Sequence, residues 1–200
     1  MPEYPIFFLK RQGKRAELTL AEKLRTAHTK RWQIVNVGRN QNVAEHSFLV
    51  QLIAIEVARA CEFSNARQGP FNTEKEHQIM RWAMWHDMME VKTGDINTPV
   101  KAVIKKAVGE SGIETLEKSY SAEYTKISAD TWPITKDIVK LADYMEALNF
   151  LNEEGKGVHA KDVQATLRAQ MMAHYHRTAS AFPSLKWENV KSLLIPLCEG

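Results

Sequence analysis

The sequence predicts an all-α protein built as a single helical bundle. Apolar side chains recur three and four residues apart along most of the chain, and the alternating pattern of strands is scarce. The chain has 200 residues, of which 44% are hydrophobic and 26% charged, so it can bury the core of one domain. We expect one domain over residues 1–200, with a motif-bearing core over about 19–155 and C-terminal helices over about 158–200.

The composition argues against several classes of partner and compartment. The net charge is only +3 and no block of Lys and Arg appears, so we expect no nucleic-acid partner. Cys61 and Cys198 lie far apart and are interpreted as free thiols of a reducing compartment. We find neither a signal-peptide pattern nor an apolar run long enough for a membrane span, so we expect a cytoplasmic protein without a membrane partner.

The first predicted helix covers Thr19–Ala27. Leu20 and Leu24 are one helical turn apart, and Thr19 with Glu22 forms a capping-box pattern. Residues 31–42 lose this period and fill with Asn and Gly, which predicts a loop.

A long helix is expected from Val43 to Cys61, with His46 near its beginning. Its inward stripe is expected to contain Leu49, Leu52, Ile53, Val57 and Ala60. Residues 63–73 then form a surface connection, and a second capping box, Thr73–Glu76, begins the next helix.

The third helix carries three ionisable side chains, His86, Asp87 and Glu90, within an apolar run. A continuous helix places His86 and Glu90 on one face, and its inward stripe is Ile79, Met80, Ala83, Met84 and then Asp87 or Met88. A buried, unpaired carboxylate costs several kcal/mol, roughly, so a divalent metal would be a suitable partner. A His-Asp pair by itself more often forms a mutual hydrogen bond or caps a neighbouring helix, so the metal depends on the rest of the sequence.

Gly94 is expected to end this helix, and Pro99 to prevent an early restart. The polar loop 93–99 would then lie beside the candidate site. Further helices are expected over 100–108 and 113–127, and the basic cluster of Lys101, Lys105 and Lys106 is interpreted as a solvated face.

Trp132-Pro133 breaks the chain before a strongly amphipathic helix over Asp137–Glu153, which carries Asp143 beside its apolar stripe. That stripe is expected to contain Val139, Ala142, Met145, Leu148 and Leu151 or Phe150. The last long helix is expected over 158–182. The remaining histidines stand in polar contexts and are expected at the surface: His28, His77, His159, His174 and His176.

Three separate helical segments thus carry possible metal ligands near an apolar stripe: His46, the His86-Asp87 pair and Asp143. Two imidazoles and two carboxylates suit a divalent ion such as Mn²⁺, Co²⁺, Fe²⁺ or Zn²⁺. This order of ligands on an all-helical chain resembles the HD-domain phosphohydrolases, and the expected bundle is then a single HD domain.

Two finer motifs narrow this resemblance. Arg31-Trp32 followed by Asn42-Val43-Ala44-Glu45-His46-Ser47, and the segment from His86-Asp87 to Pro99-Val100-Lys101, are similar to bacterial HD-domain 5′-deoxynucleotidases and phage dATP triphosphohydrolases. The similarity extends from about Arg31 to the end of the helix with Asp143.

The resemblance implies a role for each matching residue. One metal would be held by His46, His86, Asp87 and Asp143. The catalytic residues would be Glu90, which orients the attacking water, together with Asp87 and Arg31. The residues implied to bind substrate are Arg31 at the phosphate, Trp32 against the nucleotide and Asp95 at the sugar hydroxyl. We also expect Ile34, from the same loop as Arg31, to line the sugar, and Thr93 and Pro99 to bind substrate from the loop of Asp95.

The same comparison separates this chain from neighbouring activities. Guanosine tetraphosphate hydrolases of the superfamily carry a Glu-Asp pair where Glu90 is followed here by Val91. Two-metal members need extra histidines between the His-Asp pair and the last Asp, and none stands between Asp87 and Asp143. A single divalent metal is therefore expected.

The expected function is metal-dependent hydrolysis of the 5′-phosphate ester of 2′-deoxynucleotides. The substrate could be a dNTP such as dATP, giving deoxynucleoside and triphosphate, or a dNMP, because both reactions cleave the same bond. The choice depends on the room and positive charge beyond the α-phosphate. The alternative is a catalytically inactive nucleotide-binding or interaction protein on the same scaffold. A homo-oligomer is expected in either case.

Overall fold

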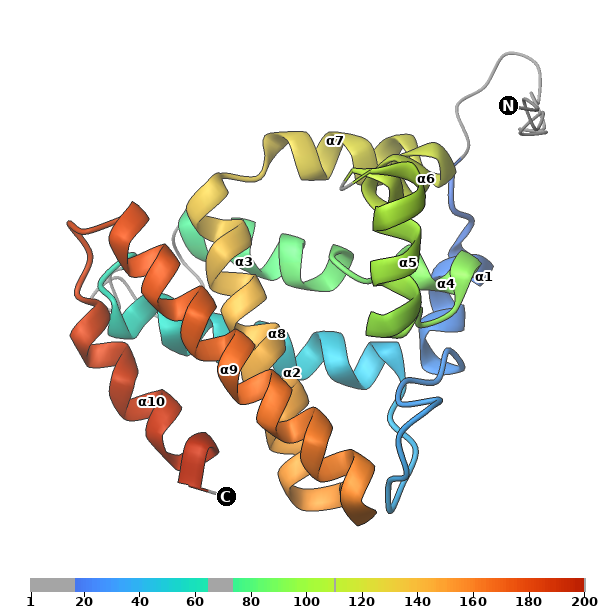
Figure 1. Ribbon diagram of the computed structural model, residues 1–200. Helices are drawn as coiled ribbons and strands as arrows, with labels where there is room; N and C mark the ends of the chain where they lie inside the picture. Colours follow the sequence, from blue (N-terminus) through green and yellow to red (C-terminus); the bar gives the residue numbers. More distant parts are fainter. Residues whose placement is uncertain (1–16, 65–73, 110, 200) are drawn as a thin grey trace.

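The computed structural model describes residues 17–64, 74–109 and 111–199, and this part of the chain is helical without strands (Figure 1). Two isolated bridges, Lys30–Asn42 and Val37–Gly155, are the extended pairings within it. The elements are α1 (Leu20–Lys23), η1 (Leu24–Ala27), α2 (Val43–Ala60), α3 (Glu74–Trp85), α4 (Glu90–Thr93), α5 (Thr98–Val108), α6 (Gly112–Tyr120), α7 (Ala122–Asp130), α8 (Pro133–Glu154), α9 (Gly157–Ala181) and α10 (Trp187–Glu199). The all-α class is confirmed, whereas the division of the chain at about residue 155 stays a prediction.

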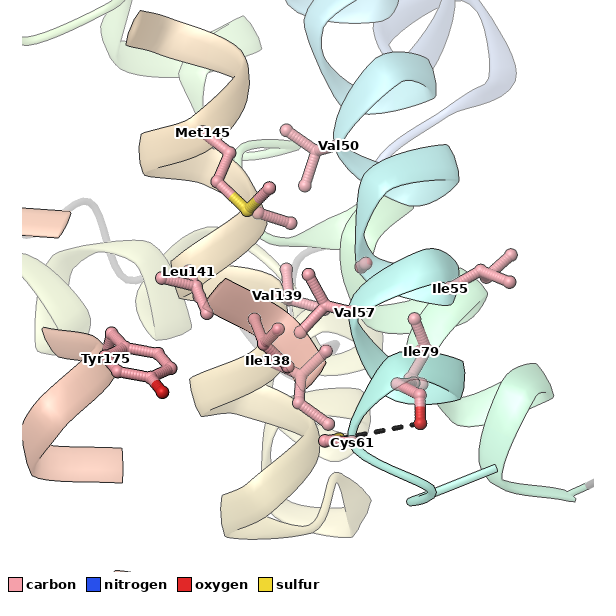
Figure 2. Packing of buried hydrophobic residues seen from close by; sticks show 14 of the residues in the cluster. Val50, Ile55, Val57, Cys61, Ile79, Ile138, Val139, Leu141, Met145 and Tyr175 are labelled. Carbon is pink, nitrogen blue, oxygen red and sulfur yellow. Dashed lines mark hydrogen bonds between the residues drawn. The ribbon is translucent and has the colours of Figure 1, made fainter. Parts of the chain in front are cut away.

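Helices α2, α3 and α8 form the centre of the bundle and pack against one another, while α9 packs against α8 and α10 against both α2 and α8. Figure 1 shows these three helices between α10 on the left and α1, α4, α5 and α6 on the right. Val50 and Val57 of α2 face Val139 and Met145 of α8 across the core (Figure 2). No described helix combines the length and hydropathy that a membrane span requires.

Local sequence signals explain where several helices begin. The predicted capping box is present at α1, although the helix continues only as the 3₁₀ turn η1. Asn42 caps α2 by accepting a hydrogen bond from the backbone N–H of Glu45 at 2.9 Å. Pro133 occupies the first turn of α8, where its missing N–H has no cost. The predicted box at Thr73 lies outside the described residues.

The inward face of α2 was predicted only in part: Val57 is fully buried, and Ile53 and Ala60 pack against the core. Leu52 is 43% exposed, whereas Val50 and Ala54 are fully buried. Helices α3 and α8 both pack on α2, so small residues and even His46 lie on the buried side while the large leucines do not. The buried stripe of α8 is confirmed, because Val139, Ala142, Met145, Leu148, Phe150 and Leu151 are all buried.

The continuous helix expected through His86 is also wrong. Helix α3 ends at Trp85, and the amides of Met88 and Glu90 bond to carbonyls only three residues back. This tighter turn buries Trp85, Met88 and Met89 in a second apolar cluster, which leaves Met84 49% exposed. His86 and Glu90 therefore do not share the face of one helix, and Glu90 instead begins α4.

Two further boundaries differ from the prediction. Gly94 does end α4, with φ +71°, but Pro99 lies in the first turn of α5 and helps that helix begin, with Asn97 as its cap. The expected helix over 113–127 is divided at Ser121, whose extended backbone and side-chain hydrogen bond to the Tyr124 amide begin α7.

One of the histidines assigned to the surface is buried. His174 donates from Nε2 to the carbonyl of Asp137 at 2.9 Å and accepts at Nδ1 from Arg177 at 3.0 Å. Burial lowers the pKa of His174, which favours this neutral form with a hydrogen bond at each ring nitrogen. It fills a core position in α9, and the other four histidines of that group are exposed as predicted: His28, His77, His159 and His176.

The contrast between Leu148 and Leu24 makes the packing testable. Leu148→Ala should lower the free energy of unfolding by about 2–5 kcal/mol, because it leaves a cavity between packed helices. Leu24→Ala, the matched control at a leucine that is 62% exposed in η1, should cost about 1 kcal/mol or less. Urea unfolding followed by circular dichroism measures both values, and equal losses would contradict the burial pattern.

Candidate metal and substrate site

The four predicted metal ligands come together from three parts of the bundle. His46 lies in the first turn of α2, His86 and Asp87 lie in the turn between α3 and α4, and Asp143 lies in the middle of α8. One ligand atom from each of them falls within 4.8 Å of the other three. Because the helix breaks after Trp85, the adjacent residues His86 and Asp87 can both direct their side chains to this cluster.

His46 is completely buried at the centre of this cluster. Its Nε2 lies 3.2 Å from Asp143 Oδ1 and 3.4 Å from Asp87 Oδ2, and its Nδ1 contacts Glu146 Oε2. Burial and Arg31 oppose protonation of the ring, but the three surrounding carboxylates raise the pKa of His46 to about 10. The carboxylates around this ring thus favour positive charge at its Nε2 atom.

His86 has the hydrogen-bond pattern of a neutral ligand. Its Nδ1 donates to the carbonyl of Ala83 at 2.6 Å, which leaves Nε2 as the acceptor atom, 3.4 Å from Asp87 Oδ2. Burial lowers the pKa of His86 and so favours the neutral ring. Metal-bound histidines commonly have this arrangement, with one nitrogen fixed by a carbonyl and the other free.

The donor set fits a divalent cation. Burial would raise the pKa of Asp87, but its contacts with His46 and the charge of Arg31 hold it far below its usual value. Lys140 and His46 likewise hold the pKa of Asp143 well below its usual value against the effect of burial. Two ionised carboxylates therefore meet two imidazole Nε2 atoms that are buried without a hydrogen-bond partner in the described part of the chain. A cation among them would satisfy all four groups.

Arg31 lies at the edge of the cluster and donates from one guanidinium nitrogen to Asp87 Oδ2 at 2.9 Å. Burial opposes its charge, but Asp87 and Asp143 raise the pKa of Arg31, so it stays a cation. Its Nε atom is buried and has no hydrogen-bond partner among the described residues. A fixed guanidinium with a donor to spare is suited to a phosphate oxygen.

The residue after Arg31 adopts a rare backbone conformation. Trp32 has φ +62°, and its backbone N–H donates to Asp95 Oδ2 at 3.3 Å. Its ring stacks on Phe150 of α8, with centroids 5.7 Å apart and planes within 3°. A left-handed conformation at a tryptophan is strained, and such strain is typical of loops that hold a side chain for function.

Glu90 is only 6% exposed at the beginning of α4. Its Oε1 lies 3.8 Å from the ammonium of Lys101, and its Oε2 has no hydrogen-bond partner in the described segments. Burial and the charge of Asp87 raise the pKa of Glu90 to about 9. Lys101 was assigned to a solvated face together with Lys105 and Lys106. The latter two are exposed, but Lys101 faces this carboxylate instead.

The other three residues predicted to bind substrate are not tied to the cluster. Ile34 is 48% exposed, and Pro99 is exposed in the first turn of α5. The Thr93 hydroxyl donates to the carbonyl of Gly94 at 2.9 Å, which helps to end α4. Their roles in binding substrate stay predictions.

The prediction missed three residues of this region. Glu146 lies one turn after Asp143 on the buried side of α8, and a charged residue inside that apolar stripe was a signal that could have found it. Lys140 donates to Asp143 Oδ2 at 2.6 Å and stands one turn earlier on the same helix. Gln41 is fully buried in the loop before α2, and nothing in the polar sequence around it indicates this.

Comparison with protein families relates the whole arrangement to known enzymes. The family described as 5′-deoxynucleotidase YfbR-like matches residues 19–183, which is most of the chain. A dATP triphosphohydrolase of Acinetobacter phage SH-Ab 15497 is 32% identical over 190 residues, covering 92% of this chain and 92% of the relative. A 5′-deoxynucleotidase of Shewanella oneidensis is 30% identical over 154 residues, covering 71% of this chain and 76% of the relative.

A solved structure extends the likeness to three dimensions. The HD phosphohydrolase DatZ of Cyanophage S-2L, bound to dA and one catalytic Zn²⁺ ion, matches with a TM-score of 0.75 and 27% identity. The match covers 92% of this chain and 96% of the other. The similarity is thus distributed over the bundle and is not confined to the His-Asp motif.

Proposed function

This chain belongs to the YfbR-like 5′-deoxynucleotidase family and is a phosphohydrolase of deoxynucleotides, and we propose that the cluster of His46, His86, Asp87 and Asp143 is its catalytic centre. The observation that carries the proposal is the meeting of two buried, unpartnered imidazole nitrogens with two ionised carboxylates within 4.8 Å. The alternative of an inactive binding protein is not favoured, because the relatives are named as phosphohydrolases and the four predicted ligands meet in space.

The cluster would hold one divalent cation, and Zn²⁺ is our proposal because DatZ was solved with a catalytic Zn²⁺. Two imidazoles and two carboxylates suit Zn²⁺, although Co²⁺, Mn²⁺ and Fe²⁺ accept the same donors. When bound, such a cation supplies a Lewis acid that polarises a phosphoryl oxygen and makes water more acidic.

Glu90 would accept the proton of the attacking water at its unpartnered Oε2. Because burial and Asp87 raise its pKa to about 9, Glu90 needs added positive charge nearby to ionise at neutral pH. The water oxygen then forms a bond to the α-phosphorus and the bond from phosphorus to O5′ breaks. The nucleoside leaves, and its O5′ takes up a proton.

Arg31 and the loop that follows it would hold the nucleotide. Arg31 is a buried cation beside Asp87, so an incoming phosphate would find a fixed partner that stabilises charge on its oxygens. The Trp32 ring offers a plane against the sugar or base, and the Asp95 carboxylate can accept a hydrogen bond from the sugar hydroxyl. The hydrogen bond from the Trp32 amide to Asp95 supports this joint role.

We propose that the preferred substrate is a deoxynucleoside triphosphate, which would leave inorganic triphosphate as the second product. Two lysines supply charge at the edge of the site, since Lys140 of α8 contacts Asp143 and Lys101 of α5 approaches Glu90. Both are partly exposed. We propose that they pair with the phosphates beyond the first, which a monophosphate lacks. Adenine is our proposed base, and it rests on the names of the phage relatives.

We further infer a cytoplasmic homo-oligomer that has no nucleic-acid partner. The cytoplasmic location is supported by Cys61 and Cys198, which are free thiols in the described part of the chain. Phe48 is 60% exposed and Leu52 43% exposed one turn apart on α2, which gives an apolar strip suited to a second copy of the chain.

The role of Glu90 can be separated from metal binding. Glu90→Gln should lower kcat by about 100-fold or more, because the amide cannot accept the proton of water. The Kd for Zn²⁺ should stay within about threefold, because Glu90 is not one of the proposed ligands. Steady-state release of deoxynucleoside and a chelator competition measure the two quantities. An unchanged kcat would remove Glu90 from the reaction.

The preference for triphosphate can be tested at the two lysines. Lys101→Ala and Lys140→Ala should each lower the ratio of kcat/KM for dATP to kcat/KM for dAMP by about 10-fold or more, since a charged hydrogen bond is worth about 1.5–3 kcal/mol, whereas any effect through Glu90 or Asp143 falls on both substrates alike. Lys106→Ala, an exposed lysine on α5, is the matched control. Equal losses on both substrates, or a wild-type protein that cleaves dAMP and not dATP, would contradict the proposal.

A further inference from the structure

A chain of buried hydrogen bonds connects the metal cluster to the loop that contains Arg31 and Trp32, which we call the nucleotide loop. It runs from the Trp32 indole through Gln41 and Glu146 to His46. We propose that Glu146 is a positioning residue that fixes the ring of His46 for the metal and, through Gln41, fixes Trp32 for the nucleotide. This inference rests on the proposed function, since it concerns residues that support the same site.

The chemistry of the groups sets the direction of each hydrogen bond in this chain. The indole N–H of Trp32 can only donate, so Gln41 Oε1 is its acceptor at 2.8 Å. The amide nitrogen of Gln41 then donates to Glu146 Oε1 at 2.6 Å. The other oxygen of Glu146 accepts from His46 Nδ1, which directs His46 Nε2 toward Asp87 and Asp143.

Burial makes these contacts difficult to replace. His46 and Gln41 are fully buried and Glu146 is 2% exposed, so bulk water cannot take over a lost partner. Glu146 lies one helical turn after Asp143. Helix α8 therefore supplies one proposed metal ligand directly and orients a second one through Glu146.

Gln41 connects the same network to the nucleotide loop by two hydrogen bonds. Its side chain accepts from the indole of Trp32, and its backbone carbonyl accepts from the amide of Arg31 at 2.9 Å. The Trp32 ring also stacks on Phe150 of α8, so the indole is fixed at both its face and its N–H edge. A change at Gln41 should thus disturb the loop without removing the partner of His46.

The first test measures the affinity for Zn²⁺ alone, by chelator competition on the full chain. Glu146→Gln replaces an acceptor pair with one acceptor and one donor, so it cannot accept from both His46 and Gln41. We expect the Kd for Zn²⁺ to rise about 10- to 100-fold. If the Glu146→Gln protein fails to fold, Glu146→Asp takes its place in the test. This variant keeps the carboxylate but shortens the side chain, so it should weaken Zn²⁺ binding similarly.

The control is Glu76→Gln, another buried carboxylate, which contacts Arg59 and Ser64 near the far end of α2. Arg59 lies 13 residues after His46, about 20 Å along the helix, so the Kd for Zn²⁺ should not change. A wild-type Kd for Zn²⁺ in a folded Glu146→Gln or Glu146→Asp protein would overturn the inference. Failure of the wild type itself to bind Zn²⁺ would instead overturn the proposed function.

The second test examines the connection to Trp32. Gln41→Leu should raise KM for the deoxynucleotide about 10-fold while the Kd for Zn²⁺ stays within about threefold, because the contact between His46 and Glu146 remains. Trp32→Phe keeps an aromatic ring that can stack on Phe150 and removes the indole N–H, so its effect on KM should not add to that of Gln41→Leu. Additive effects in the double variant would show that the two side chains act separately and would overturn the connection.

Discussion

The buried negative charge at the centre of the bundle is the constraint on which the rest of the site depends. Asp87 and Asp143 are held ionised in a region from which water is largely excluded, and an uncompensated charge there would cost several kcal/mol, roughly. Arg31 and Lys140 each contact one of these carboxylates, and the carboxylates around His46 raise the pKa of its ring to about 10. A divalent cation bound at His46 Nε2 would displace a proton from the ring, so metal binding and protonation are linked through one imidazole.

The packing of the bundle places the charged groups where they can meet. Helices α2 and α8 pack against each other, which brings His46 beside Asp143 and Glu146. The tight turn after Trp85 adds His86 and Asp87 from a third direction. The loop before α2 then carries Arg31 and Trp32 to the same region, and the short helix α4 carries Glu90.

Much of this could be predicted from the sequence, and the failures have physical causes. The ligand types, the capping box at Thr19 and the buried face of α8 follow from local patterns that tertiary packing does not alter. The face of α2 and the end of α3 depend on which helices pack against them, so periodicity alone placed Leu52 inside and His86 in a helix. The role of Gln41 could be recognised only from the structure, because its hydrogen-bond partners Trp32 and Glu146 lie 9 and 105 residues away in the sequence.

Calorimetric titration of the metal-free protein with Zn²⁺, in buffers of different ionisation enthalpy at pH 7, tests this account most directly. The account predicts one site per chain and release of at least one proton per ion, because the His46 pKa of about 10 lies above the working pH and the ring must become neutral to bind. Asp143→Asn should remove most of this binding. Binding without proton release, or undiminished binding by the Asp143→Asn protein, would contradict the account.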